Sequence, residues 1–135
     1  MTQHATRLLI VYNADSGIIN ALMHAVHKQV RPETYPCSLC ALTYGAVSMR
    51  GEWKRFLNSL PMDVVFHHRD DFAEAYLGHD FELPAILMSE PGEELRLFIA
   101  AEELDAMTDA AELIDRVEDK LVTESLYGPR LRVVA

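Results

Sequence analysis

The chain has 135 residues, half of them apolar, which is long enough for one compact domain with a buried core. Its formal net charge is −9, and residues 90–124 hold the whole excess, with twelve acidic and three basic side chains. Because nucleic-acid affinity depends on Lys and Arg neutralising phosphates, this charge argues against a DNA or RNA partner. The acidic run is typical of a solvated helix face, with a docking face for a basic partner as the alternative.

The N-terminal region predicts the compartment. The first apolar run, residues 8–12, is followed directly by Asn13 and Asp15, which interrupts any signal-peptide core. No stretch of the sequence approaches the length needed to cross a bilayer. We therefore expect a cytoplasmic protein with no membrane contact. In the reducing cytosol structural disulfides are scarce, so a Cys-x-x-Cys pair there indicates catalysis, metal binding or burial.

Strand and helix signals alternate along the chain. The predicted order is a strand at 7–12, a helix at 15–30, a cysteine segment at 34–45, a helix at 51–60, a strand at 62–68, a short helix at 70–76, a β-hairpin at 83–100 and a helix at 109–122. The first strand is a continuous apolar run, which is typical of a strand buried on both faces. Trp53 belongs to the apolar face of its helix. The last predicted helix has an apolar stripe opposite its acidic residues, formed by Ala110, Leu113, Ile114, Val117, Leu121 and Val122.

Polar residues follow the two parallel strand candidates. Asp15 and Ser16, after the first, are N-cap candidates, and the same small residues can hold an anion at a helix N-terminus. The stretch "HHRDDF" follows the second strand, at the end where α/β folds often carry function. The interpretation we favour there is a salt-bridged turn in which Asp70 or Asp71 caps the next helix.

This order of elements resembles the thioredoxin-like superfamily, and Leu83-Pro84 stands where that family places a cis-proline before its hairpin. The resemblance covers residues 7–122, with 31–60 as an insertion. It implies an α/β sandwich, a single domain over 1–135, with a central mixed sheet of about four strands, flanking helices and an inserted Cys37-x-x-Cys40 segment. The blocks "NADSGI" and "TYPCSLCALTYG" also resemble a family of small uncharacterised bacterial proteins, which carries no established chemistry.

The cysteines depart from the thioredoxin pattern. That family places Cys-x-x-Cys directly after the first strand, at a helix start that lowers the pKa of the attacking thiol. Here residues 13–17 contain no cysteine, and Cys37 and Cys40 come after the first helix. Simple topology puts the end of that helix at the opposite pole of the sheet from Pro84, and Ser38 and Leu39 give no helix-start signal. Only Pro84 therefore transfers from the family.

Thiol redox chemistry is the leading functional interpretation. Two thiols in Cys-x-x-Cys can close a disulfide when the intervening residues turn. The Cys37 thiolate would attack the substrate disulfide, and Cys40 would resolve the resulting mixed disulfide. A positive charge on Lys28, Arg31 or His27 would favour the thiolate. The partner would be a protein or a small thiol.

Zinc binding by a non-enzymatic metal-binding or interaction module is the alternative. A structural zinc needs four ligands, so Cys37 and Cys40 would be joined by His27 and by His24 or His67. His24 and His27 are spaced i, i+3 and share one side of a helix. His67 and the histidine after it lie in a strand and must point to opposite faces, so only one of them can join.

Packing is the third interpretation, because small unpaired cysteines are often buried. The sequence leaves these three interpretations open. An exposed hairpin edge and the apolar tail at 131–135 also provide surfaces through which the chain could form a homodimer.

Overall fold

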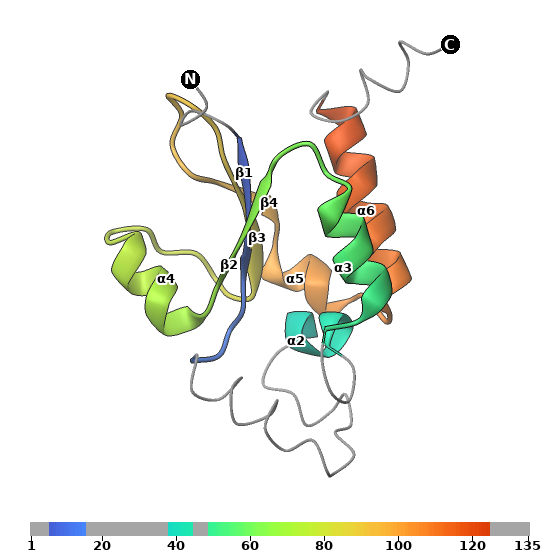
Figure 1. Cartoon of the computed structure of the whole chain (residues 1–135). Helices are drawn as coiled ribbons and strands as arrows, with labels where there is room; N and C mark the ends of the chain where they lie inside the picture. The colour runs from blue at the N-terminus through green and yellow to red at the C-terminus, as the bar shows by residue number, and fades with distance from the viewer. Residues whose placement is uncertain (1–5, 16–37, 45–48, 125–135) are drawn as a thin grey trace.

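A four-stranded mixed sheet forms the centre of the computed structural model, which describes residues 6–15, 38–44 and 49–124. Its strands are β1 (Arg7–Val11), β2 (Asp63–His67), β3 (Ala85–Ser89) and β4 (Arg96–Ile99), in the order β2-β1-β3-β4. β1 is parallel to β2 and antiparallel to β3, which is antiparallel to β4. The α/β class and the mixed sheet are as predicted (Figure 1).

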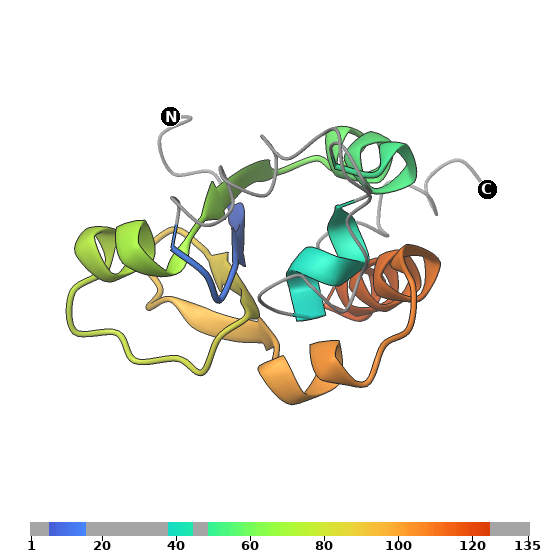
Figure 2. The ribbon, with the colours of Figure 1, turned by 90° about the horizontal axis from the view of Figure 1, so that it is seen from below.

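Helices flank the sheet on both sides. One face is covered by α2 (Ser38–Thr43), α3 (Gly51–Asn58), α5 (Ala101–Asp105) and α6 (Ala110–Thr123), and the other by α4 (Arg69–Ala75) (Figures 1 and 2). This layering is compatible with the expected thioredoxin-like sandwich. None of the helices in the described ranges is long and apolar enough to cross a membrane. The predicted helix after Asp15 and the C-terminal tail lie outside the described residues.

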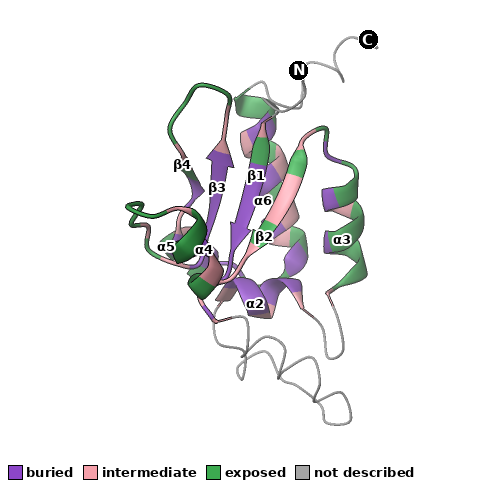
Figure 3. Ribbon diagram, turned by 60° about the vertical axis from the view of Figure 1, so that its left-hand side comes forward, coloured by how far each residue is buried: buried purple, intermediate pink, exposed green. Residues whose placement is uncertain are grey.

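β1 is buried on both faces, as its continuous apolar run predicts. Leu8 and Ile10, with Tyr12 just beyond the strand, belong to the larger core cluster, whereas Leu9 and Val11 belong to the smaller one beneath α4. None of these five residues has any exposed surface (Figure 3). The alternation of side chains along a strand sends successive residues into the two clusters.

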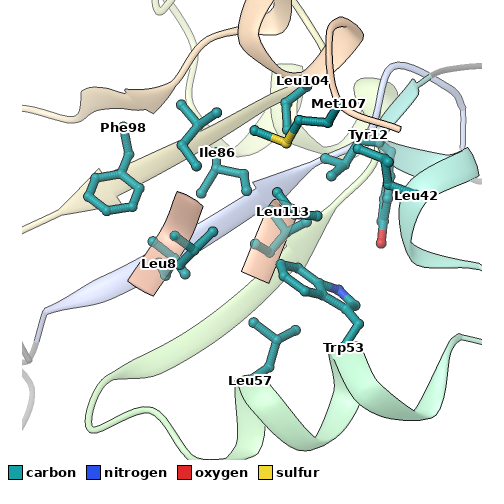
Figure 4. Packing of buried hydrophobic residues seen from close by; sticks show 14 of the residues in the cluster. Leu8, Tyr12, Leu42, Trp53, Leu57, Ile86, Phe98, Leu104, Met107 and Leu113 are labelled. Atoms are coloured by element: carbon teal, nitrogen blue, oxygen red, sulfur yellow. The ribbon is translucent and has the colours of Figure 1, made fainter. Parts of the chain in front are cut away.

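The larger cluster is built from segments that are far apart in the sequence. α3 contributes Trp53 and Leu57, as its predicted apolar face requires, and α6 contributes Leu113 (Figure 4). α2 adds Leu42, and α5 adds Leu104. The segment predicted as an insertion therefore supplies part of the main core.

α6 begins where the Asp109 carboxylate accepts a hydrogen bond from the Glu112 backbone N–H at 2.9 Å. Its predicted apolar stripe is buried at Leu113, Val117 and Leu121. Val122, which we expected in the stripe, is 38% exposed, because it comes one position after the buried Leu121 and so faces away from the sheet. The short helix α5 has no counterpart among the predicted elements.

The hairpin of β3 and β4 turns where Gly92 takes a positive φ of 74°, a conformation that glycine adopts without a steric penalty. Arg96 then ties the hairpin to α6. Its Nε donates to Glu90 at 3.1 Å and its Nη2 to Glu124 at 2.7 Å. The predicted hairpin is confirmed, with a register irregularity between Ile86 and Leu87.

We predict that Leu113→Ala lowers the free energy of unfolding by about 2–5 kcal/mol, because it leaves a cavity between α6 and the sheet. Val122→Ala on the same helix is the matched control and should change stability by no more than about 0.5 kcal/mol, because that side chain is partly in solvent. Urea unfolding followed by circular dichroism measures both. Equal losses for the two variants would contradict the packing described.

Candidate functional site

The carboxyl ends of β1 and β2 are joined by backbone hydrogen bonds. The Tyr12 N–H donates to the His67 carbonyl at 2.9 Å, and the Arg69 N–H donates to the Ala14 carbonyl at 2.9 Å. Parallel neighbours end at the same edge of a sheet, so the polar residues that follow each strand meet here. This edge is the candidate functional site.

Pro84 lies at the same edge. Val11 pairs with Ala85 across β1 and β3, so the residue before Ala85 is opposite the residue after Val11. The Leu83-Pro84 peptide bond is cis, as the resemblance implied, and Pro84 is buried. The prediction of a cis-proline directly before the first hairpin strand is therefore confirmed.

The described part of the cysteine segment contains a helix that the sequence did not predict. α2 begins at Ser38, where we expected no helix start. The Ser38 hydroxyl donates to the Asp105 carboxylate of α5 at 2.6 Å. Cys40 and Thr43 face inward, and neither has any exposed surface. Cys37 comes immediately before α2 in the sequence and lies outside the described residues.

The end of the predicted helix, which we expected at the opposite pole of the sheet from Pro84, lies outside the described residues, whereas α2 lies at the same pole as Pro84. The Tyr12 Oη lies 3.1 Å from the Thr43 Oγ1, which brings α2 against the residue that follows β1. Cys40 is one turn earlier on the same helix and belongs to the same core cluster as Tyr12. α2 therefore lies at the carboxyl end of β1, where Pro84 also lies.

The buried Tyr12 lies at the centre of an aromatic cluster at this edge. Its ring contacts those of Tyr44 at 5.6 Å, Phe66 at 6.4 Å and His68 at 5.8 Å between centroids. Burial raises the pKa of Tyr12 well above its usual value, and the charged forms of Tyr44 and Cys40 raise it further. The phenol therefore keeps its proton throughout the physiological pH range.

Two histidines share the carboxylate of Asp71. His67 Nδ1 lies 2.8 Å from Asp71 Oδ1, and His68 Nδ1 lies 3.3 Å from Asp71 Oδ2. A carboxylate only accepts hydrogen bonds, so both rings carry their proton on Nδ1. The His68 Nε2 is buried and has no hydrogen-bond partner among the residues that the structure describes.

Asp71 also corrects the predicted cap of α4. We expected Asp70 or Asp71 at the N-cap, but the helix begins at Arg69 and His68 holds that position. Asp71 sits three residues further on, where its Oδ1 accepts the His68 backbone N–H at 3.0 Å. The carboxylate thus satisfies one of the free donors at the helix start from inside the first turn. Asp71 contacts both histidines of the turn, and Arg69 of the same turn forms an ion pair with Asp15.

Asp15 is engaged by the same turn. Its Oδ1 accepts a hydrogen bond from Arg69 Nε at 3.1 Å, and Asn13 Oδ1 accepts from Arg69 Nη1 at 3.4 Å. The pair is half-exposed, and it links the loop after β1 to the start of α4. Ser16, the other predicted binding residue here, lies outside the described residues.

The predicted metal set is only partly within the described ranges. Cys40 is among them, whereas Cys37, His24 and His27 are not. No three His, Cys, Asp or Glu side chains among the described residues are grouped so that they could hold a metal ion. His67 and Cys40 cannot bind the same metal ion, because the His67 ring packs on the α4 side of the sheet and Cys40 belongs to the cluster on the other side.

A hollow of about 230 Å³ lies beside the start of α2. Ala41, Leu42 and Met107 give it apolar surface, and Arg50 and Asp109 lie among its polar lining residues. Ser38, the residue after Cys37, also lines it. The hollow is therefore next to the cysteine segment along the chain.

Comparison of the chain with models of known families, with curated proteins and with solved structures gave no match. Among the residues that the sequence singled out, the structure brings Asp15 into contact with the turn at 67–71 and places Pro84 and Cys40 at the same end of the sheet. Tyr12 and Thr43 were missed as site residues. The signal that could have found Tyr12 is its place as the first residue after a buried parallel strand, where functional side chains often lie.

We predict that Asp71→Ala lowers the free energy of unfolding by about 1–2 kcal/mol, because it leaves the His68 N–H at the helix start without its carboxylate partner. In ¹⁵N NMR spectra the Nδ1-protonated forms of His67 and His68 should lose their dominance. Glu74→Ala is the control, because it removes the same charge from the same helix at an exposed position. The shared-carboxylate assignment fails if both variants leave the histidine tautomers unchanged.

Proposed function

We propose that the protein is a cytoplasmic thiol–disulfide redox protein in which Cys37 attacks and Cys40 resolves. The observation that carries this proposal is the burial of Cys40 in the first turn of α2, at the sheet edge that holds Pro84. A thiol without exposed surface cannot meet a bulky disulfide directly. Its chemistry is then restricted to a neighbouring thiol of the same chain, and Cys37 is the other cysteine of the sequence.

The reaction needs no group beyond the two cysteines and the substrate disulfide. The Cys37 thiolate attacks one substrate sulfur, the substrate S–S bond breaks, and the other substrate sulfur leaves as a thiolate that takes a proton from water. The Cys40 thiolate then attacks the Cys37 sulfur and releases the second substrate thiol. The dithiol is oxidised to a disulfide by two electrons, and the substrate disulfide is reduced by the same two.

The hollow beside Ser38 supports a protein disulfide or a small thiol as the partner. Its volume of about 230 Å³ is enough for a large side chain next to the reacting cysteine of a peptide. Its apolar surface would favour an aliphatic or aromatic side chain there. The acidic charge of the chain argues against nucleic acid in this role.

Zinc bound by Cys37, Cys40, His24 and His27 stays the competing prediction. Such a site would make the thiolates metal ligands and would take them out of disulfide exchange. One experiment separates the two proposals.

The experiment is native mass spectrometry of protein purified without oxygen or chelators, repeated after mild oxidation. We expect a metal-free mass that falls by about two hydrogens on oxidation and recovers with reductant. The variants Cys37→Ser and Cys40→Ser are matched controls, and neither should show this reversible loss. Circular dichroism should be unchanged between the two redox states.

An added mass of about one zinc ion, lost in Cys37→Ser, would replace the redox proposal by the metal site. A wild-type mass that changes in neither way would mean that the cysteines serve packing alone.

A further inference from the structure

We propose that the hollow beside the start of α2 binds a basic side chain, a lysine or an arginine, of a partner polypeptide. The inference deepens the proposed redox function, and the identification of this partner as the disulfide substrate rests on that function. Ser38, the residue after Cys37, lines the hollow. The binding itself depends on side chains that the structure describes.

Segments that are distant in the sequence form the apolar part of the hollow. α2 contributes Leu42, the segment between α5 and α6 contributes Met107, and α6 contributes Ala110. All three side chains are buried, and α2 packs against both α5 and α6 (Figure 2). Core packing therefore holds this apolar surface in place.

Two carboxylates line the hollow directly. Glu52, in the first turn of α3, and Asp109, at the N-cap of α6, are both exposed. The Asp109 Oδ1 accepts the Glu112 backbone N–H, and a carboxylate has further lone pairs that can accept from a ligand. The Glu52 carboxylate has no hydrogen bond or ion pair within residues 6–15, 38–44 and 49–124. Both groups are therefore able to receive a cation.

Two more carboxylates contact polar residues of the lining. Asp105 accepts the Ser38 hydroxyl at 2.6 Å, and Glu112 accepts the Thr108 backbone N–H at 2.9 Å. Arg50 is the one cationic side chain among the described residues of the lining. Carboxylates thus outnumber guanidinium groups around the hollow by four to one.

A basic side chain matches both parts of this lining. The methylene groups of lysine or arginine bury against apolar surface, whereas the cationic end stays at the polar rim. The Arg50 guanidinium and the partial charge of about +0.5 at the start of α6 oppose a cation, but together they are less than half the charge of the four carboxylates. An acidic side chain would be repelled by the same four groups.

The place of the hollow along the chain indicates where the basic residue lies in a substrate. Ser38 is joined covalently to Cys37, so a substrate cysteine that reacts with Cys37 brings its own neighbours to the hollow. We therefore expect substrate proteins with a lysine or an arginine within a few residues of the reacting cysteine.

The test is the binding of sulfur-free peptides to the full chain, followed by the NMR chemical shifts of Leu42, Met107 and Ala110. The probes are acetyl-Gly-Lys-Gly-amide, the same peptide with Nε-acetyllysine, and the same peptide with glutamate. The lysine peptide should bind about two- to five-fold more tightly than the acetyllysine peptide, which is the effect of one partly exposed charge pair. The glutamate peptide should bind most weakly, and added salt should reduce these differences.

Variants of the lining separate charge from shape. Asp109→Asn keeps the oxygen that caps α6, and Glu52→Gln keeps the length of the side chain, so each should weaken binding of the lysine peptide by about two- to five-fold. Arg50→Gln removes the opposing cation and should strengthen binding by a similar factor. Asp119→Asn, at an exposed position of α6 outside the lining, is the matched control and should leave binding unchanged.

Three results would overturn the inference. The first is equal binding of the lysine and acetyllysine peptides, or no binding of either. The second is tighter binding of the glutamate peptide. The third is weaker binding in all the lining variants, Arg50→Gln included, because the loss would then follow from disturbed packing and not from charge.

The peptides contain no sulfur, so the binding test and the redox test fail separately. A wild-type chain that forms no reversible disulfide removes the redox function and the substrate role of the partner, whatever the peptides do. A reversible disulfide together with binding that does not depend on peptide charge removes only the preference assigned to the hollow.

Discussion

Burial of β1 on both faces is the constraint that shapes the rest of the molecule. The strand lies between β2 and β3, and its side chains from Leu8 to Val11 enter two separate clusters. Both clusters must be covered by apolar side chains from other elements, and no polar side chain can replace one of the four buried residues Leu8 to Val11 without a large desolvation cost. Polar and reactive groups are therefore restricted to the strand ends, where Tyr12 and the turn after β2 lie.

The described parts of the segment 31–60 cover one face of the sheet, and the same segment of the sequence contains both cysteines. α3 places Trp53 and Leu57 against the sheet, and α2 places Leu39 and Cys40 there. Because interiors are closely packed, the position of α2 is set by its neighbours and not only by its own sequence. The thiol of Cys40 is consequently held by the same contacts that fill the core.

The sequence predicts the elements whose apolar residues have a clear spacing or that are bounded by a clear stop signal such as proline. The continuous run of β1, the apolar face of α3 and the stripe of α6 belong to this class, as does Pro84 before the hairpin. α2 and α5, with six and five residues, are too short to show a helical period. The contact of Tyr12 with Thr43 joins residues 31 positions apart, and local sequence patterns do not predict contacts between residues so distant in the sequence.

The edge position of β2 has a consequence for aggregation. Its segment Val64–Phe66 is apolar and β-branched or aromatic, and Phe66 is 38% exposed. An edge strand of this composition is a template for pairing with a second, partly unfolded chain. The strand is short, Pro61 precedes it, and Asp63 places a charge at its exposed start. These features limit the length over which the strand of another chain could pair with β2, so they oppose aggregation through its apolar residues.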